Sequence, residues 1–151
     1  MKKKYMVLLV DRNRASMFAL MDDVVSKKEV LKSDDTPQKV KHGDDTWDAQ
    51  NKIFRHIEDH LHRHLQKVGS YAQVFAKENH ITEIIIGGHR PLFAKVKKNL
   101  PPSLSKKVKG TFVTELKVSF GEILKRAKKC IDIIEREEEV RRYEKNFTHK
   151  E

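Results

Sequence analysis

Three regularly spaced histidines form the densest group of side chains in this chain that could do chemistry. His56, His60 and His64 recur every fourth residue, and an i, i+4 histidine pair on a helix can hold a divalent metal ion. However, a helix turns by about 100° per residue, so the rings drift round its surface, with His64 near the apolar stripe and His56 facing water. The Glu that follows the first His in metalloproteases is also missing. We therefore expect no metal and no cofactor, and interpret the histidines as part of a polar, weakly basic helix face.

Two further side chains, Asp11 and Cys130, belong to types that serve in catalysis. Asp11 ends the first apolar run, where some nucleases keep a metal-binding carboxylate, but such enzymes need several carboxylates that converge on metal ions. We interpret Asp11 as closing a turn onto backbone amides. Cys130 is the only cysteine and falls on the apolar side of the last expected helix, which is typical of a buried, inert thiol.

The junction at residues 87–90 offers a different chemistry, the binding of an anion. Gly87, Gly88, His89 and Arg90 lie between an expected strand and an expected helix. Backbone amides at such a junction can hold a phosphate with help from Arg90, but a tight turn from strand to helix also needs glycine. Both interpretations stay open. The same is true of Trp47, which either packs at the start of a helix or stacks on a base.

The chain as a whole carries a large excess of positive charge. Lys and Arg number 32 against 22 Asp and Glu, which gives a formal net charge of +10 and a pI near 9.7 for 151 residues. Such a balance favours a polyanionic partner such as RNA or a ribosome. Six lysines in neighbouring expected elements form one candidate patch, and six other residues are candidates for phosphate contact. The patch consists of Lys95, Lys97, Lys98, Lys106, Lys107 and Lys109, and the other candidates are Lys39, Lys41, His42, Arg55, Arg63 and Arg90.

The elements that position these side chains follow from hydrophobic periodicity and turn signals. Short apolar runs separated by polar turns predict an antiparallel meander of three strands, the third polar enough to be an edge. A long loop rich in turn-forming residues spans 33–46, and an apolar stripe at three- and four-residue spacing then predicts a helix. The expected strands are 5–10, 15–20, 24–32, 81–88 and 108–116, and the expected helices are 47–79, 89–100 and 119–147.

The order β-β-β-α-β-α-β-α predicts an α/β fold with a mixed five-stranded sheet and helices packed on its faces. The first three strands are antiparallel, and the last two join in parallel through right-handed crossovers. The run at 81–88 is nearly all apolar, which suits a central strand covered on both faces. The apolar positions of the last helix are Ile123, Ala127, Cys130, Ile131, Ile134 and Val140.

Length and composition exclude several classes of protein. The chain fits one domain, which we place at 1–135, followed at 136–151 by a charged tail that continues the last helix. No apolar run approaches the ~20 residues of a membrane span, and the apolar run near the amino terminus is too short for a secretory signal. A single cysteine cannot form an internal disulfide. We therefore expect a cytoplasmic protein that does not enter a membrane.

Several segments together resemble the middle domain of archaeal and eukaryotic class-1 peptide release factors. The stretch MVLLVDRNRASMFAL is similar to the first hairpin of that domain, and IFRHIEDHLHRHLQKVG is similar to the helix behind its Gly-Gly-Gln loop. The stretch IIIGG, with the later LPP and KKVKGT, is similar to its second half. The resemblance covers about residues 3–135, and it extends to stand-alone bacterial and archaeal relatives of the domain.

This resemblance implies an RNase-H-like mixed sheet and, in complete release factors, hydrolysis of peptidyl-tRNA by the Gly-Gly-Gln loop. Here the corresponding loop reads KHGDDTWDAQ, in which only Gly43 and Gln50 could stand in for that motif. Its aspartates would repel a tRNA backbone. We therefore expect a translation-associated domain that binds ribosomal RNA or tRNA without standard hydrolysis. Two alternatives remain: a peptidyl-tRNA hydrolase that uses Gln50, and a protein-interaction module whose tail helix forms a homodimer.

Overall fold

The computed structural model describes residues 2–33 and 47–148. Within these ranges, the side chains of residues 47–51, 53, 54, 147 and 148 are not described. The predicted loop residues Lys39, Lys41 and His42 therefore lie outside the described part of the chain, and Gln50 is placed by its backbone alone.

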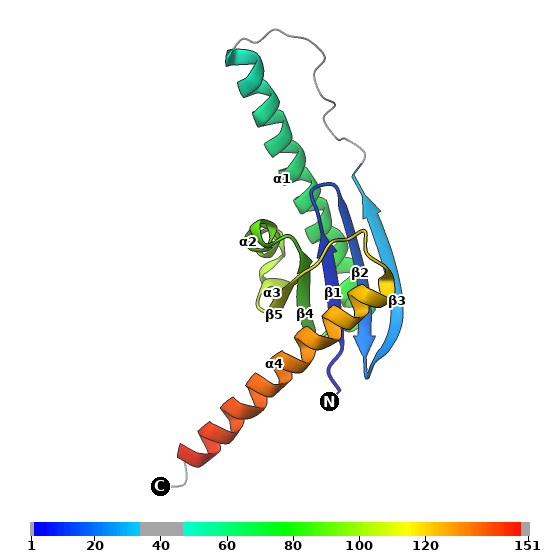
Figure 1. The fold of residues 1–151 in the computed structure, drawn as a ribbon, viewed down its shortest axis with the longest axis vertical. Helices are drawn as coiled ribbons and strands as arrows, with labels where there is room; N and C mark the ends of the chain where they lie inside the picture. Colours follow the sequence, from blue (N-terminus) through cyan, green and yellow to red (C-terminus); the bar gives the residue numbers. More distant parts are fainter. Residues whose placement is uncertain (1, 34–46, 149–151) are drawn as a thin grey trace.

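The described elements match the expected order, with one additional short helix (Figure 1). The boundaries differ from expectation mainly at β5, which ends at Val113 rather than at residue 116. Its partner strand β4 ends at Gly88, to whose carbonyl Thr114 donates the last amide hydrogen. No helix in the described ranges is both long and apolar enough to cross a membrane. The strands are β1 (Tyr5–Val10), β2 (Arg14–Met21), β3 (Val24–Lys32), β4 (Glu83–Gly88) and β5 (Val108–Val113), and the helices are α1 (Trp47–Glu78), α2 (Arg90–Asn99), α3 (Pro102–Ser105) and α4 (Phe120–Thr148).

The five strands form one mixed sheet in the order β3-β2-β1-β4-β5. β1 pairs antiparallel with β2 and β2 with β3, whereas β1 pairs parallel with β4 and β4 with β5. This arrangement confirms the predicted RNase-H-like sheet, with the polar strand β3 at one edge and the apolar strand β4 inside. The register aligns Val10 with Gly88, so the parallel strands β1 and β4 have their carboxyl ends side by side.

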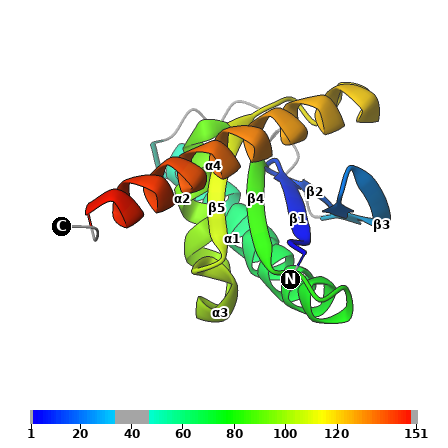
Figure 2. The ribbon, with the colours of Figure 1, turned by 90° about the horizontal axis from the view of Figure 1, so that it is seen from below.

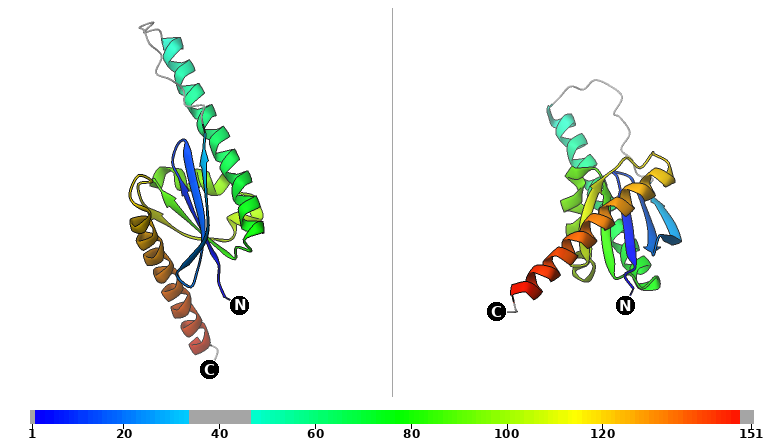
Figure 3. Two further views of the ribbon diagram at one scale, coloured as in Figure 1. Left: turned by 90° about the vertical axis from the view of Figure 1, so that its right-hand side faces the viewer. Right: turned by 60° about the horizontal axis from the view of Figure 1, so that its bottom comes forward.

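Two cores cover the two faces of the sheet, because successive strand side chains point to opposite sides. Met6 and Leu8 of β1 pack with residues of α1, α2 and α3, whereas Val7 and Leu9 pack with residues of α4. The views in Figures 2 and 3 show the same division, with α1 and α4 on opposite sides of the sheet. The chain is therefore a three-layer α/β/α structure.

Each of the two long helices packs against the sheet along only part of its length. The amino-terminal half of α1 extends past one end of the sheet, and the carboxy-terminal half of α4 extends past the other (Figures 1 and 3). In α4, Ile123, Ala127, Ile131 and Ile134 are buried as predicted. Val140, the last apolar position of the helix, is 54% exposed, because the helix has left the sheet by that point.

Candidate nucleic-acid interface

The helix α1 presents one apolar face to the sheet and leaves its basic side chains in solvent. Leu61, Leu65, Val68, Ala72 and Phe75 are buried at the spacing expected of a core-facing stripe. Two predicted contact residues, Arg55 and Arg63, are both exposed. Because they are eight residues apart, about 800° of helix rotation places them about 80° from one another, and they face different directions.

A groove of about 440 Å³ runs between α1 and α2, and we call it the α1–α2 groove. Two predicted patch residues, Lys95 and Lys98, line it from α2, and His62 faces them from α1. Arg55 precedes His62 by seven residues, so it lies on the same side of α1, two turns further out. The full lining is Glu58, Leu61, His62, Leu65, Lys95, Lys98 and Asn99.

A glycine sets how closely these two helices approach. A Cβ atom added at Gly69 would collide with the backbone carbonyl of Asn99 at the end of α2. The side-chain amide of Asn99 also donates to the Lys95 carbonyl at 2.8 Å, which ties the last turn of α2 together. The position of the lysines beside α1 therefore depends on Gly69.

The remaining lysines of the predicted patch lie in other surroundings. Lys97 is exposed on α2 and Lys106 is exposed after α3. Lys107 donates its amine to the Ile81 carbonyl at 3.2 Å, and the Lys109 amine lies 3.9 Å from the Glu83 carboxylate. The structure thus brings Lys95 and Lys98 to α1 and places Lys107 and Lys109 beside the start of β4.

One histidine of α1, His64, contacts the hairpin between β1 and β2. His64 is almost fully buried, and its Nε2 lies 3.1 Å from the Asp11 carbonyl and 3.2 Å from the Arg14 carbonyl. Nε2 must be the donor in these contacts, so Nδ1 accepts from the Ser33 hydroxyl at 2.6 Å. Burial lowers the pKa of His64, against the smaller opposing effect of the two carbonyls.

The other two histidines of the metal hypothesis do not join His64 in a metal site. His56 is exposed, as expected from the helix wheel. His60 is buried, and no described residue bonds to its Nε2. Within residues 2–33 and 47–148, no group of three His, Cys, Asp or Glu side chains is arranged to hold a metal ion.

The ends of β1 and β4 are shaped by turn geometry and close packing. The Asp11 carboxylate accepts the amide hydrogens of Asn13 and Arg14, and so closes the turn between β1 and β2. Gly88 has a φ of +143°, and a Cβ atom there would collide with the Val10 carbonyl. Arg90 is exposed at the start of α2. A Cβ at Gly87 would collide with side chains of β1 and β5. Close packing therefore accounts for glycine at both positions.

Cys130 behaves as expected of a structural thiol. It lies on α4 and is partly rather than fully buried, and its Sγ lies 3.7 Å from the Thr111 carbonyl. Burial raises the pKa of this thiol, which disfavours the nucleophilic thiolate.

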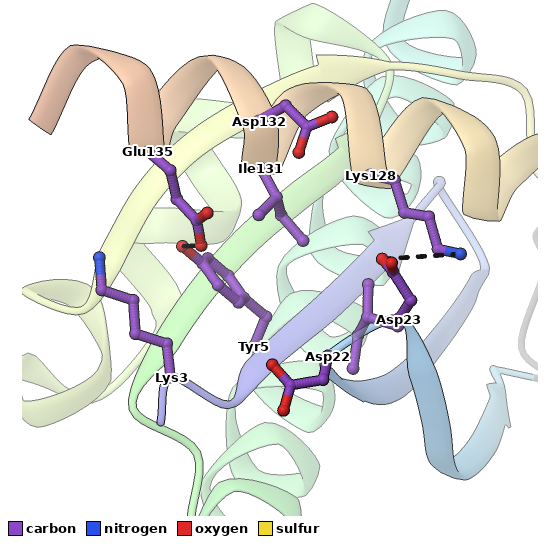
Figure 4. A pocket seen from close by; sticks show the side chains of 9 residues that line it. Lys3, Tyr5, Asp22, Asp23, Lys128, Ile131, Asp132 and Glu135 are labelled. Atoms are coloured by element: carbon purple, nitrogen blue, oxygen red, sulfur yellow. Dashed lines mark hydrogen bonds and ion pairs between the residues drawn. The ribbon is translucent and has the colours of Figure 1, made fainter. Parts of the chain in front are cut away.

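A pocket of about 320 Å³ on the α4 side of the sheet was not predicted from the sequence (Figure 4). Asp22 and Asp23 in the turn between β2 and β3 face Asp132 and Glu135 of α4 across it. The Tyr5 hydroxyl donates to Glu135 at 3.3 Å, and burial, followed by the charge of Glu135, raises the pKa of Tyr5. The sequence signals were the Asp-Asp turn and the i, i+3 acidic pair on a helix.

Cations compensate part of this acidic charge. The Lys128 amine lies 3.7 Å from Asp23, the Lys2 amine lies 3.1 Å from Asp22, and Lys3 lines the pocket while bonding to Glu138. Four carboxylates at one site still make this side of the molecule unfavourable for a phosphate backbone. The α1–α2 groove, on the opposite face of the sheet, is the better site for a polyanion.

Comparison with known proteins agrees with this fold. A family model described as bacterial archaeo-eukaryotic release factor family 10 matches residues 1–131. The crystal structure of an archaeal translation termination factor, aRF1, is similar over 97% of this chain and 40% of its own, with 16% identity and a TM-score of 0.52. A second structure, of an archaeal protein, is similar over 96% of this chain and 41% of its own, with 15% identity and a TM-score of 0.52. The chain thus spans about two fifths of the length of each structure. No curated protein sequence matches it.

Proposed function

The chain belongs to bacterial archaeo-eukaryotic release factor family 10, and on this basis we propose that it is a translation-associated domain that binds ribosomal RNA or tRNA. The site would be the α1–α2 groove, extended by Arg55 on the exposed side of α1. A domain with this task would work in the cytoplasm, beside ribosomes.

The observation that carries this proposal is the meeting of α1 and α2 around Lys95 and Lys98. Neither lysine forms an ion pair with a described residue, so both amines remain available to phosphate oxygens. His62 adds positive charge when it is protonated, while Glu58 removes one charge. Phosphate contacts of this kind give affinity without base specificity.

We further propose that binding occurs without the hydrolysis performed by complete release factors. The sequence contains no Gly-Gly-Gln segment, and Gln50 lies in the first turn of α1. The residues Lys39, Lys41 and His42 precede that turn in the sequence and are further candidates for phosphate contact. The archaeal termination factor with the similar fold supports the choice of ribosomal RNA or tRNA as partner.

Co-sedimentation with ribosomes tests the partner, and peptide release from peptidyl-tRNA tests the chemistry. We expect the protein to pellet with ribosomes at low and moderate salt and to release no peptide. Failure to pellet even at low salt would contradict RNA binding. Peptide release by the wild-type chain that is lost in Gln50→Ala would instead establish the hydrolase alternative.

A further inference from the structure

The two edges of the sheet differ in how well they are protected. Exposed sheet edges invite pairing with another strand, and charged side chains are a common protection. β3, at one edge, carries Lys27, Lys28 and Glu29 in its middle and ends at Lys32. β5, at the other edge, has the sequence VKGTFV and carries Lys109 as its single charge. Among the described residues, only β4 pairs with β5, so this edge is open.

The direction of the free backbone groups of β5 follows from its hydrogen bonds. Thr114 donates its amide hydrogen to Gly88 of β4, and backbone groups alternate sides along a strand. Phe112 therefore also points its amide toward β4, while Thr111 and Val113 point theirs away from the sheet. Two amide and two carbonyl groups are thus presented to an added strand, although the Thr111 carbonyl also contacts the Cys130 thiol.

The helix α4 covers one face of the position that an added strand would occupy beside β5. It crosses the sheet diagonally and continues beyond β5 (Figure 2). A groove of about 470 Å³ lies between this overhang and β5, and we call it the β5–α4 groove. Ile133 of α4 and Phe112 of β5 line the groove from its two sides, and the Ile133 side chain is 49% exposed. Exposed apolar side chains gathered in one groove are a common mark of an interaction site.

The charges around this groove decide which partner fits it. Lys109, Arg126 and Lys129 line it, against a single carboxylate, Glu137. Lys109 and Arg126 also pair with Glu83 and Glu122, so Lys129 carries the least compensated positive charge. A second copy of this chain would bring the same cationic groove, and a further net charge of +10, toward the first. A segment with apolar and acidic side chains would instead cover Ile133 and Phe112 and balance the lysines.

We propose that the β5–α4 groove binds an extended, acidic and apolar peptide segment of a partner protein, which adds to the sheet as a sixth strand beside β5. Backbone hydrogen bonds to Thr111 and Val113 hold the segment, one of its apolar side chains packs beneath Ile133, and its carboxylates lie near Lys109 and Lys129. This surface is separate from the α1–α2 groove, and the proposal does not rest on RNA binding.

A fluorescent peptide that alternates Val and Glu over about six residues, the length of β5, serves as the probe for fluorescence anisotropy with the full chain. We expect it to bind at least about tenfold more tightly than a matched Val-Lys peptide. Ile133→Glu should weaken its binding at least about tenfold, because the variant removes an apolar contact and adds a like charge. Val24→Glu is the matched control, since Val24 is 63% exposed on the opposite edge strand, and it should leave binding unchanged.

Hydrogen exchange locates the bound peptide. We expect the amides of Thr111 and Val113 to gain protection and those of β3 to remain as they are. Equal binding of the two peptides, no binding at millimolar concentration, or full binding by Ile133→Glu overturns the proposal. So does displacement of the peptide by a single-stranded RNA oligonucleotide with protection of the same amides, which assigns the groove to RNA. A dimer seen by light scattering and abolished by Ile133→Glu assigns it to a second copy.

Discussion

The sharpest test of the proposed RNA interface neutralises the two lysines of α2 together. Lys95 and Lys98 line the same groove, are exposed, and form no ion pair with a described residue. The double variant Lys95→Gln, Lys98→Gln should therefore keep the fold and lose two phosphate contacts. Lys117 and Lys125 are also exposed but lie outside the α1–α2 groove. Changing both to Gln gives a control with the same loss of net charge.

The expected magnitude follows from counterion release. Each phosphate contact contributes about 0.9 to the slope of log K against log salt, so the loss of two contacts lowers the slope by about 1.8. The counterion contribution vanishes at about 1 M salt, so at about 0.1 M, a tenfold lower concentration, a slope change of 1.8 corresponds to an affinity about 60-fold weaker. The control variant should change affinity only slightly, because long-range charge effects on a surface are screened within about 10 Å at this salt concentration.

The assay is a salt titration of binding to a labelled ribosomal RNA fragment, with circular dichroism to verify the fold of each variant. A parallel loss of affinity in both double variants would mean that net charge alone drives binding. An unchanged slope in the Lys95→Gln, Lys98→Gln variant would show that RNA does not contact the α1–α2 groove. Either result would refute the proposal that RNA binds in the α1–α2 groove through Lys95 and Lys98.

Further predictions concern the parts of the fold that hold these surfaces. Because burial lowers the pKa of His64 in the folded state, its contribution to stability is present above the ordinary histidine pKa and is lost as the pH falls below it. The urea midpoint should drop between about pH 7 and about pH 5, and this drop should shrink in His64→Gln. Gly69→Ala should lower Tm in a thermal scan, since its collision with α2 costs about 1–3 kcal/mol and outweighs the gain in helix propensity of about 1 kcal/mol; a higher Tm would contradict the tight approach. Asp23→Gly should raise the free energy of unfolding by about 1 kcal/mol in urea denaturation, because Asp23 has a φ of 67° that glycine adopts without strain. Since the pKa of Tyr5 is raised, the wild type and Tyr5→Phe should show the same phenolate absorbance change up to about pH 11, and a smaller change in the variant would place Tyr5 in solvent.

Much of the fold could be predicted because its signals are local. The apolar run of β1 and the three- and four-residue spacing in α1 lie within a few consecutive residues, so periodicity was enough to find them. The end of β5 was misplaced by three residues because its partner strand β4 ends at Gly88, and the sequence around residues 108–116 does not show where a partner strand ends. Periodicity shows which side of a helix is apolar but not where the sheet beneath it ends, so it does not separate the exposed Val140 from the buried positions before it.

The candidate sites were less predictable, because each joins residues far apart in the sequence. Lysine clustering indicated one patch over 95–109, but the chain reversal at α3 sends Lys107 to β4 and leaves Lys95 beside α1. The acidic pocket brings Asp22 together with Asp132, from a turn and a helix separated by most of the chain.

The sequence by itself determined the order of the elements, the excess of positive charge and the family to which the chain belongs, because these depend on composition and on patterns along the chain. Only the tertiary structure decided which charges share a surface and which strand edge is left open. The physical reason is that strand order and helix packing bring distant residues together. Close contacts, such as that of Gly69 with the end of α2, then fix how closely the elements approach.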